Sequence, residues 1–356
     1  MSIFAQLTIN SLIAGSIYSL VAIGFSLIYS TNKFVHFAHG VSVAVAGYLI
    51  YLLFALWGVP FYLAALLTVI LSGLLGVGMY RWIYLPLQSG DLNHATPLVS
   101  IVFGALVYSV LKIAQFNNNL SNPFRWIEII SFLCAIILGF LLYTRFSLPK
   151  NRKKASNVVL LIASIGILIL FQNLIQLIFG ANVKEIGYLE VRKGMEIWGA
   201  SITPLQVVII AVSVVLMISF YFFMKYTRLG RNMRAVSDNK ELASVMGINY
   251  RRIADYSFFI GSGLAGVAGI LIGLEQNLEP VMGTMLIIKG FTGAVIGGVS
   301  SVAGAVVGSG LLGFAENFGI WYLPSGYKDA IAFVLLFIFL LIRPTGIFGI
   351  NKGVKQ

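Results

Sequence analysis

Long uncharged apolar runs constrain the fold of this chain more than any other feature of its sequence. Leu205–Met224 and Tyr256–Leu274, for example, contain no charged residue, and each is close to the ~20 residues that a helix needs to cross a bilayer. The runs are continuous, whereas a membrane β-barrel shows short alternating segments. The chain is 59% hydrophobic and 10% charged, while in a soluble domain about half of the residues are apolar and about a quarter are charged. These observations predict an all-α polytopic membrane protein.

The apolar runs predict about 10 transmembrane helices. Counting gives ten or eleven, because the pieces near 34–56 and 284–318 are interpreted as broken or re-entrant helices. Eleven full spans would put the N-terminus outside and ten would put it inside. Residues 1–10 carry no charge that decides between these topologies, so the side of the N-terminus is left open.

Basic residues cluster between the runs and predict which side each loop faces. Residues 225–252 hold seven bases against two acids, and such a segment between two spans is expected on the cytoplasmic side. Residues 145–154 are basic without acids, whereas the loop 181–204 balances three bases against three acids, which fits the outer face. The formal net charge of +12 follows from this topology, so it does not indicate nucleic-acid binding.

A short helix is expected within residues 225–252. Ser237 and Asp238 can cap it, because their side-chain oxygens accept hydrogen bonds from free first-turn amides, and Gly247 is suited to end it. Such a helix would offer the cytoplasm a compact surface on which another protein can dock. A solvated positive-inside loop explains the charges equally well, so both interpretations stay open.

Four stretches of sequence, in order, carry a resemblance to a known family. Glu241-Leu242-Ala243-Ser244-Val245-Met246-Gly247 resembles the E-A-A-x-x-x-G signature of ABC-importer permeases, with Leu242 in place of the first Ala. The other three stretches are SIYSLVAIGFSLIYSTNKFVHFAHG, KGFTGAVIGGVSSVAGAVVGSGLLGFAEN and YKDAIAFVLLFIFLLIRPTGIFG. Together they resemble the permease subunits of branched-chain amino-acid ABC importers over most of the chain, except roughly residues 90–155.

The resemblance implies a single permease domain over residues 1–356 in the bacterial cytoplasmic membrane. It implies transport of branched-chain or other neutral amino acids, and no enzymatic activity. The implied partners are two ABC ATPase subunits that bind ATP and Mg, a related or identical second permease subunit, an extracytoplasmic solute-binding protein and membrane lipid. No cofactor is expected on this chain, which has no GxxxxGK[ST] phosphate-binding loop.

In the same family picture, residues 225–252 form the cytoplasmic coupling loop. Movement of the ATPases would press on its short helix. Ala243 and Gly247 would let this helix sit closely in a cleft, and Glu241 with the surrounding arginines would provide an electrostatic fit. The expected ATPase-coupling residues are Ser237, Asp238, Glu241, Ala243 and Gly247.

Residues 90–155 are predicted to be an inserted helical hairpin. Ala95–Leu111 and Ile129–Thr144 are uncharged runs slightly short for a span, and Asn117–Pro123 between them is rich in turn residues. The shorter family pattern has no counterpart to this hairpin. An even number of added spans leaves the orientation of later segments unchanged.

Ionisable residues isolated in apolar runs are functional candidates, because charge inside a membrane is costly. Lys289 lies between uncharged runs, and Glu316 follows the uncharged run Gly290–Ala315. An ion pair between them would lower the cost of both, and this structural role is favoured over contact with a substrate. Lys328-Asp329 opens the last span and is interpreted as an anchor at the membrane interface.

A polar translocation path is expected to offer hydroxyl, amide and backbone groups without a tight site, since a substrate must be released easily. His36 and His39 can share one helical face. No carboxylate or thiol nearby in the sequence completes a metal site, so no metal is predicted. The path candidates are Ser16, Ser19, Asn32, His36, His39, Lys289 and Thr292.

Three G-x-x-x-G pairs predict close helix packing in the last hundred residues, because each leaves two bare backbone patches on one helix face. They are Gly269–Gly273, Gly293–Gly297 and Gly304–Gly308.

Other functions remain open from the residues. A urea or short-amide ABC permease would share the pattern, and so would a stand-alone channel or secondary transporter, which would need no ATPase. An intramembrane enzyme would need a nucleophile–base pair or a zinc motif, and none is recognisable in the sequence.

Overall fold

The computed structural model describes residues 2–90, 155–188, 194–197 and 199–349. These residues belong to two compact units, the first comprising Met1–Val77 and Leu161–Gln356 and the second Gly78–Leu160. The segment 91–154 lies outside the described residues, so the predicted hairpin 90–155 remains a prediction. In the second unit, the described part contains η2 (Tyr80–Tyr84) and α4 (Leu85–Ser89), and the Ala155 N–H donates to the Leu87 carbonyl at 3.0 Å.

Seven helical segments among the described residues are long and apolar enough to cross a membrane, and an eighth is counted if a bent pair of helices forms one span. This confirms the predicted all-α membrane fold. The elements of these spans are α1 (Ser2–Asn32), α2 (His39–Ile50) with η1 (Tyr51–Leu56), α3 (Phe61–Met79) with η2 and α4, α7 (Asn157–Phe179), α8 (Pro204–Tyr226), α11 (Tyr250–Gln276), and α14 (Lys328–Ile342) with the preceding turn η4 (Ser325–Tyr327).

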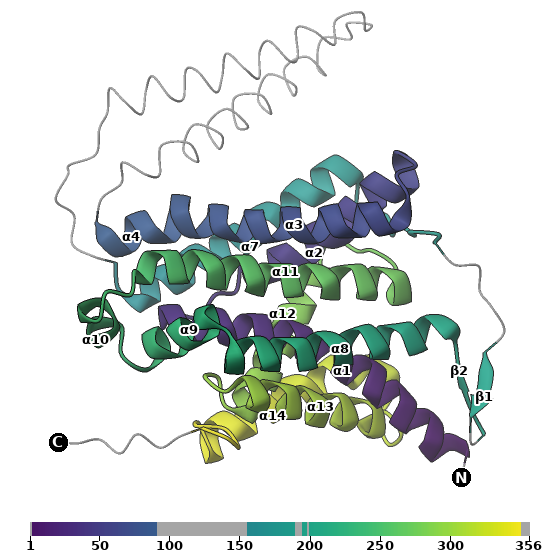
Figure 1. Ribbon diagram of the computed structural model, residues 1–356. Coiled ribbons are helices and arrows are strands. Elements are labelled where there is room, and N and C mark those ends of the chain that lie inside the picture. Colours follow the sequence, from purple (N-terminus) through teal and green to yellow (C-terminus); the bar gives the residue numbers. More distant parts are fainter. Residues whose placement is uncertain (1, 91–154, 189–193, 198, 350–356) are drawn as a thin grey trace, which may run out of the picture. The chain divides into compact units, whose positions relative to one another are not determined.

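Helix α1 is the centre of the first unit (Figure 1). It packs against α8, α11, and the bent pair α12 (Met282–Gly297) and α13 (Val302–Gly319). Its small residues allow close approach: Gly15 lies against the backbone of Gly310, and a side chain at Gly24 would overlap the Gly261 carbonyl. By contrast, α8 and α14 bury few of their side chains, as expected for helices whose outer faces meet lipid or another subunit.

Two interruptions of helix fall where broken helices were predicted. Lys33 adopts φ +61°, and the non-helical residues that follow it separate α1 from α2 while Phe34 and His36 stay buried. The second interruption lies between α12 and α13, which meet at 115°. Gly298 has φ +110° there, a conformation that glycine adopts without the steric penalty of a side chain.

A small β-hairpin precedes α8, formed by β1 (Met195–Ile197) and β2 (Ala200–Ile202) with Met195 opposite Ile202. Sequence reasoning expected only a loop here. Such a pair of strands is compatible with a position outside the hydrocarbon layer, where water satisfies its open edges. At the start of α8, Thr203 and Gln206 form a reciprocal capping box, which explains why the helix begins at Pro204.

The two ends of the first unit differ in character. We call the end with β1 and β2 the hairpin end, and the end with α9 (Arg228–Asp238) and α10 (Lys240–Val245) the basic end; they lie at opposite ends of α8 (Figure 1). Gln6 Nε2 donates to the Ser201 carbonyl at 3.1 Å, and the Ser201 N–H donates to Gln6 Oε1 at 2.8 Å. The start of α1 therefore lies at the hairpin end, opposite the basic loop, so a cytoplasmic basic loop, as predicted, would put the N-terminus outside.

Candidate functional site

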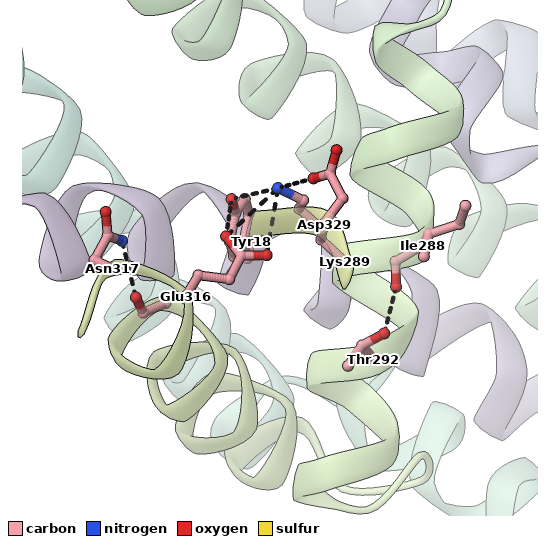
Figure 2. Close-up of polar contacts among 8 residues, drawn as sticks. Tyr18, Ile288, Lys289, Thr292, Glu316, Asn317 and Asp329 are labelled. Atoms are coloured by element: carbon pink, nitrogen blue, oxygen red, sulfur yellow. Dashed lines mark hydrogen bonds and ion pairs between the residues drawn. The ribbon is translucent and has the colours of Figure 1, made fainter. Parts of the chain in front are cut away.

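A cluster of charged side chains joins four helices (Figure 2). Lys289 of α12 places its Nζ 3.3 Å from Oε1 of Glu316 on α13 and 2.8 Å from Oδ1 of Asp329 on α14. The Tyr18 hydroxyl of α1 donates to Oε2 of Glu316 at 2.8 Å, and Lys289 donates to the Tyr18 oxygen at 3.2 Å. The predicted Lys289–Glu316 ion pair is confirmed, and a second carboxylate joins it.

The exposure of the charged side chains in this cluster increases from the interior to the surface. The Glu316 side chain is fully buried, that of Lys289 is 11% exposed, and that of Asp329 is 50% exposed. A buried charge needs a partner and hydrogen bonds to offset its lost hydration. Glu316 obtains both from Lys289 and Tyr18, whereas Asp329 can also be solvated. Glu316 is therefore the fixed partner of Lys289, and Asp329 is the more exchangeable one.

Close packing of α12 on α13 brings Lys289 opposite Glu316. A side chain at Gly297 would overlap the carbonyl of Gly304, and one at Gly308 would overlap the carbonyl of Gly293. Two of the three predicted glycine pairs therefore pack against each other. This backbone contact holds the two helices close enough for side chains on facing turns to form an ion pair.

A cavity of about 360 Å³ borders this cluster. Tyr18, Lys289 and Asp329 line it together with the end of α11, the first turns of α12 and the turn η4. A second cavity of about 300 Å³ shares Tyr18 and Lys328 with the first and extends along α1 as far as Asn10. Both include Gln276, the last residue of α11, so both lie towards the hairpin end.

The basic end carries a short helix that projects from the first unit. Leu242 and Val245 of the six-residue helix α10 and its C-cap residue Met246 are exposed at 60%, 85% and 74%. Exposed apolar groups of this size, next to the basic residues of α9, are typical of a surface that another protein covers. The spacing of these residues places them along one face, which the sequence pattern could have indicated.

Helix α9 attaches this projection firmly to α8. The Thr227 side chain accepts a hydrogen bond from the Gly230 N–H at 3.0 Å, and Arg234 donates to the Met224 carbonyl. Met233 and Val236 are buried. Displacement of α10 would therefore be passed to α8 and, through a link of four residues, to α11.

The cap of the short helix differs from the prediction. Ser237 and Asp238 form the last turn of α9, and Asn239 caps α10 by accepting from the N–H groups of Glu241 and Leu242, both at 3.0 Å. Asn239 is extended, with φ −152°, so the chain turns one residue later than expected. The cap prediction at Ser237 and Asp238 was therefore wrong, because their backbone continues the preceding helix.

The end of α10 agrees with the prediction. Gly247 adopts φ +81°, the Ile248 N–H donates to the Ala243 carbonyl at 3.0 Å, and the Gly247 N–H donates to the Ser244 carbonyl at 3.1 Å. This is the Schellman arrangement that glycine favours. Ala243 is 4% exposed, so its small side chain faces its own chain rather than a cleft in a partner, which corrects the expected role of that residue.

The comparisons with known proteins agree on one family. The family described as "Branched-chain amino acid transport system / permease component" matches residues 7–131 and 101–340. The chain belongs to this family. The high-affinity branched-chain amino acid transport system permease protein LivH of Escherichia coli (strain K12) is 30% identical over 355 residues, covering 97% of this chain and 96% of LivH. BraD of Pseudomonas aeruginosa is also 30% identical, covering 97% and 96%, and a probable LivH of Methanocaldococcus jannaschii is 26% identical, covering 74% and 85%.

Family membership confirms several expectations from the sequence. The chain is a permease of the ABC-importer class, a multi-pass protein of the cytoplasmic membrane and a transport subunit rather than an enzyme. The permease aligns with LivH over nearly its whole length.

Of the seven path candidates in the permease, only Lys289 lines the larger cavity. Ser19 donates to the Gly15 carbonyl at 2.6 Å and Thr292 to the Ile288 carbonyl at 2.8 Å, both within their own helix. Ser16 is buried in α1, and Asn32 donates to the Ile28 carbonyl at 3.2 Å. Neither of the two cavities described above brings these side chains together, and their role in a path remains a prediction.

The two histidines lie in the interior of the permease, at the junction of α1 and α2. His36 and His39 are fully buried, with ring centroids 6.1 Å apart, and His36 packs edge-on to Phe258 at 5.0 Å. His39 lies against Gly24 of α1. Within the described segments, no three His, Cys, Asp or Glu side chains gather closely enough to hold a metal ion. The observed contacts are those of packing groups that hold the broken helix in place.

Proposed function

We propose that the permease moves branched-chain or other neutral amino acids across the cytoplasmic membrane as part of an ATP-driven importer. Its partners are two ABC ATPase subunits, which carry ATP and Mg, a second permease subunit, identical or related, and an extracytoplasmic solute-binding protein. The names of LivH and BraD, which describe high-affinity branched-chain amino acid systems, support this substrate class. Transport of urea or short amides is the alternative.

The projecting helix α10 is the observation that carries this proposal. Its exposed apolar face is a surface for the ATPase, and arginines around it, Arg228, Arg231 and Arg234 on α9, favour an acidic groove. ATP-driven closure of the ATPases would push α10, and the firm attachment through α9 would shift α8 and α11 as rigid bodies.

The predicted coupling residues take different roles in this proposal. Glu241 is exposed on α10 and contacts the ATPase directly. Gly247 provides the turn that ends the helix, and Ala243 packs it against its own chain. Ser237 and Asp238, at the end of α9, act through the position of α10 rather than by capping it.

A charge placed in the apolar face of α10 tests the docking surface. Val245→Asp should reduce copurification of the ATPase subunits and uptake of leucine by at least about tenfold, since a buried unpaired charge costs more than 1.4 kcal/mol. Ser244→Asp is the matched control, because Ser244 is exposed on the same helix outside the apolar face and should lose much less. Normal ATPase association and uptake in Val245→Asp would overturn the docking proposal, and uptake without any ATPase present would support a stand-alone transporter.

A further inference from the structure

We infer that the larger cavity beside Lys289 is a binding site for zwitterionic amino acids within this subunit. The inference rests on the proposed transport function and names where the substrate is held and which chemical groups select it. It starts from the charges that line the cavity. Lys289 and Lys328 oppose Glu279 and Asp329, so the wall offers two bases and two acids. Such a wall can pair with both ends of a zwitterion.

The exchangeable partner of Lys289 gives the site its selectivity. Glu316 and Tyr18 hold Lys289 from the interior, while Asp329 reaches it from the half-exposed side at 2.8 Å. A substrate carboxylate can replace Asp329 at Lys289, and the substrate ammonium then pairs with the Asp329 carboxylate that was released. Every charge keeps a partner in this exchange.

A ligand with only one charge leaves the exchange incomplete. An amine without a carboxylate would pair with Asp329 and leave Lys289 with only Glu316. A carboxylate without an amine would displace Asp329 and leave it to water. Each ligand with a single charge therefore forms only one of the two ion pairs that a zwitterion forms, and uncharged urea and amides form neither. Because charge-assisted hydrogen bonds are the stronger ones, the geometry favours the zwitterion over all of these ligands.

Apart from the charged residues, one part of the cavity wall is polar, with Gln276, Asn277 and Ser325, and another part is apolar. Ile272 from α11 and Met282, Met285 and Leu286 from α12 line it, and Met285 is 43% exposed. Unbranched methionine side chains adapt to ligands of different shape. A cavity of about 360 Å³ is within the range of small-molecule pockets, ~300–1,000 Å³. The site therefore fits an aliphatic amino acid whose side chain lies along α12.

Protection of a single cysteine tests the site without any need for transport. Cys134 is the only cysteine of the chain, so the double variant Cys134→Ser, Met285→Cys, assembled with its ATPases in membranes, can be labelled at the cavity wall by a maleimide. L-leucine should slow labelling at least about threefold, since protection grows as 1 + [L]/Kd. Leucinamide, which lacks the carboxylate, and 4-methylpentanoate, which lacks the ammonium, should protect little.

Two variants make the result specific. Asp329→Asn in the labelling background should abolish protection by leucine, and Asp329→Glu should restore part of it. Cys134→Ser, Val307→Cys is the matched control, because Val307 is 43% exposed on α13 but does not line the cavity; no ligand should protect it. Equal protection by all three ligands, or none by leucine, would overturn the inference. Labelling needs neither ATP nor uptake, so this failure is distinct from normal ATPase association in Val245→Asp or uptake without any ATPase, which would refute the proposed function.

Discussion

Lys289 and Glu316 form an ion pair, but removing either partner should not have the same effect on stability. In Lys289→Met, the fully buried Glu316 carboxylate keeps only the Tyr18 hydroxyl as a direct partner. In Glu316→Gln, by contrast, Lys289 keeps Asp329 at 2.8 Å. The structure therefore predicts that loss of the base destabilises the permease more than loss of the acid.

The magnitudes follow from the partners that remain. Removing one member of a buried pair costs about 3–5 kcal/mol, and Lys289→Met should lie near the lower limit, because Lys328 still attracts Glu316 electrostatically. Glu316→Gln loses charge-assisted hydrogen bonds, a loss of about 2 kcal/mol, because the amide oxygen can still accept from Tyr18. The double variant Lys289→Met, Glu316→Gln leaves no buried charge unpaired, so its loss should be smaller than the sum of the single losses by about 1–3 kcal/mol.

The free energies of unfolding of the unaltered permease, the two single variants and the double variant, measured in detergent by denaturant titration with tryptophan fluorescence, give this double-mutant cycle. The control is Glu196→Gln, which removes an exposed carboxylate on β1 and should change stability little. A Glu316→Gln loss equal to or larger than the Lys289→Met loss would refute the assignment of Asp329 as the second partner. Strict additivity of the two single variants would show that the pair is not coupled at all.

Two further changes test the packing and the cap. Gly297→Ala should destabilise the permease by several kcal/mol or prevent folding, because the new Cβ would overlap the Gly304 carbonyl. Gly310→Ala is the matched control and should be tolerated, because a Cβ at Gly310 meets nothing within 4 Å. Comparable yields of both folded variants, measured by size-exclusion chromatography, would contradict the packing. Asn239→Ala should lower ATPase copurification severalfold, because it removes the cap of α10, a loss of about 1 kcal/mol. Ser237→Ala should have little effect. A larger loss in Ser237→Ala than in Asn239→Ala would show instead that Ser237 caps the helix, as the sequence predicted.

Local patterns predicted much of the fold, because each needs only neighbouring residues. The apolar runs mark the spans, and Leu205–Met224 differs from α8 by only one or two residues at each end. The G-x-x-x-G spacing predicted close packing, and the backbone contact of Gly297 with Gly304 confirms it. The end of the first unit at which α1 starts could not be predicted, since it depends on the contact of Gln6 with Ser201, 195 residues away in the sequence.

The charge cluster was predicted only in part, for a related reason. Lys289 and Glu316 stand out because each is isolated among apolar residues. Asp329 follows Lys328 directly, so the sequence indicated a local ion pair with Lys328 and gave no sign of a contact with Lys289. Its contact with Lys289 depends on where α14 begins relative to α12, which neither helix specifies alone.

The hydroxyl groups of the predicted path show why polarity within an apolar helix is an ambiguous signal. A buried serine or threonine can donate to the carbonyl four residues earlier in its own helix, as Ser19 and Thr292 do, and then needs no pathway to satisfy it. A carbonyl in its own helix does not neutralise a charged side chain, so a buried charge needs an ion-pair partner on another helix. Glu279, Lys289, Lys328 and Asp329 line one cavity, although the first and last are fifty residues apart in the sequence. The polar site that could hold a substrate is therefore made where helix ends meet, and the charges that helices cannot satisfy internally are the better guide to it.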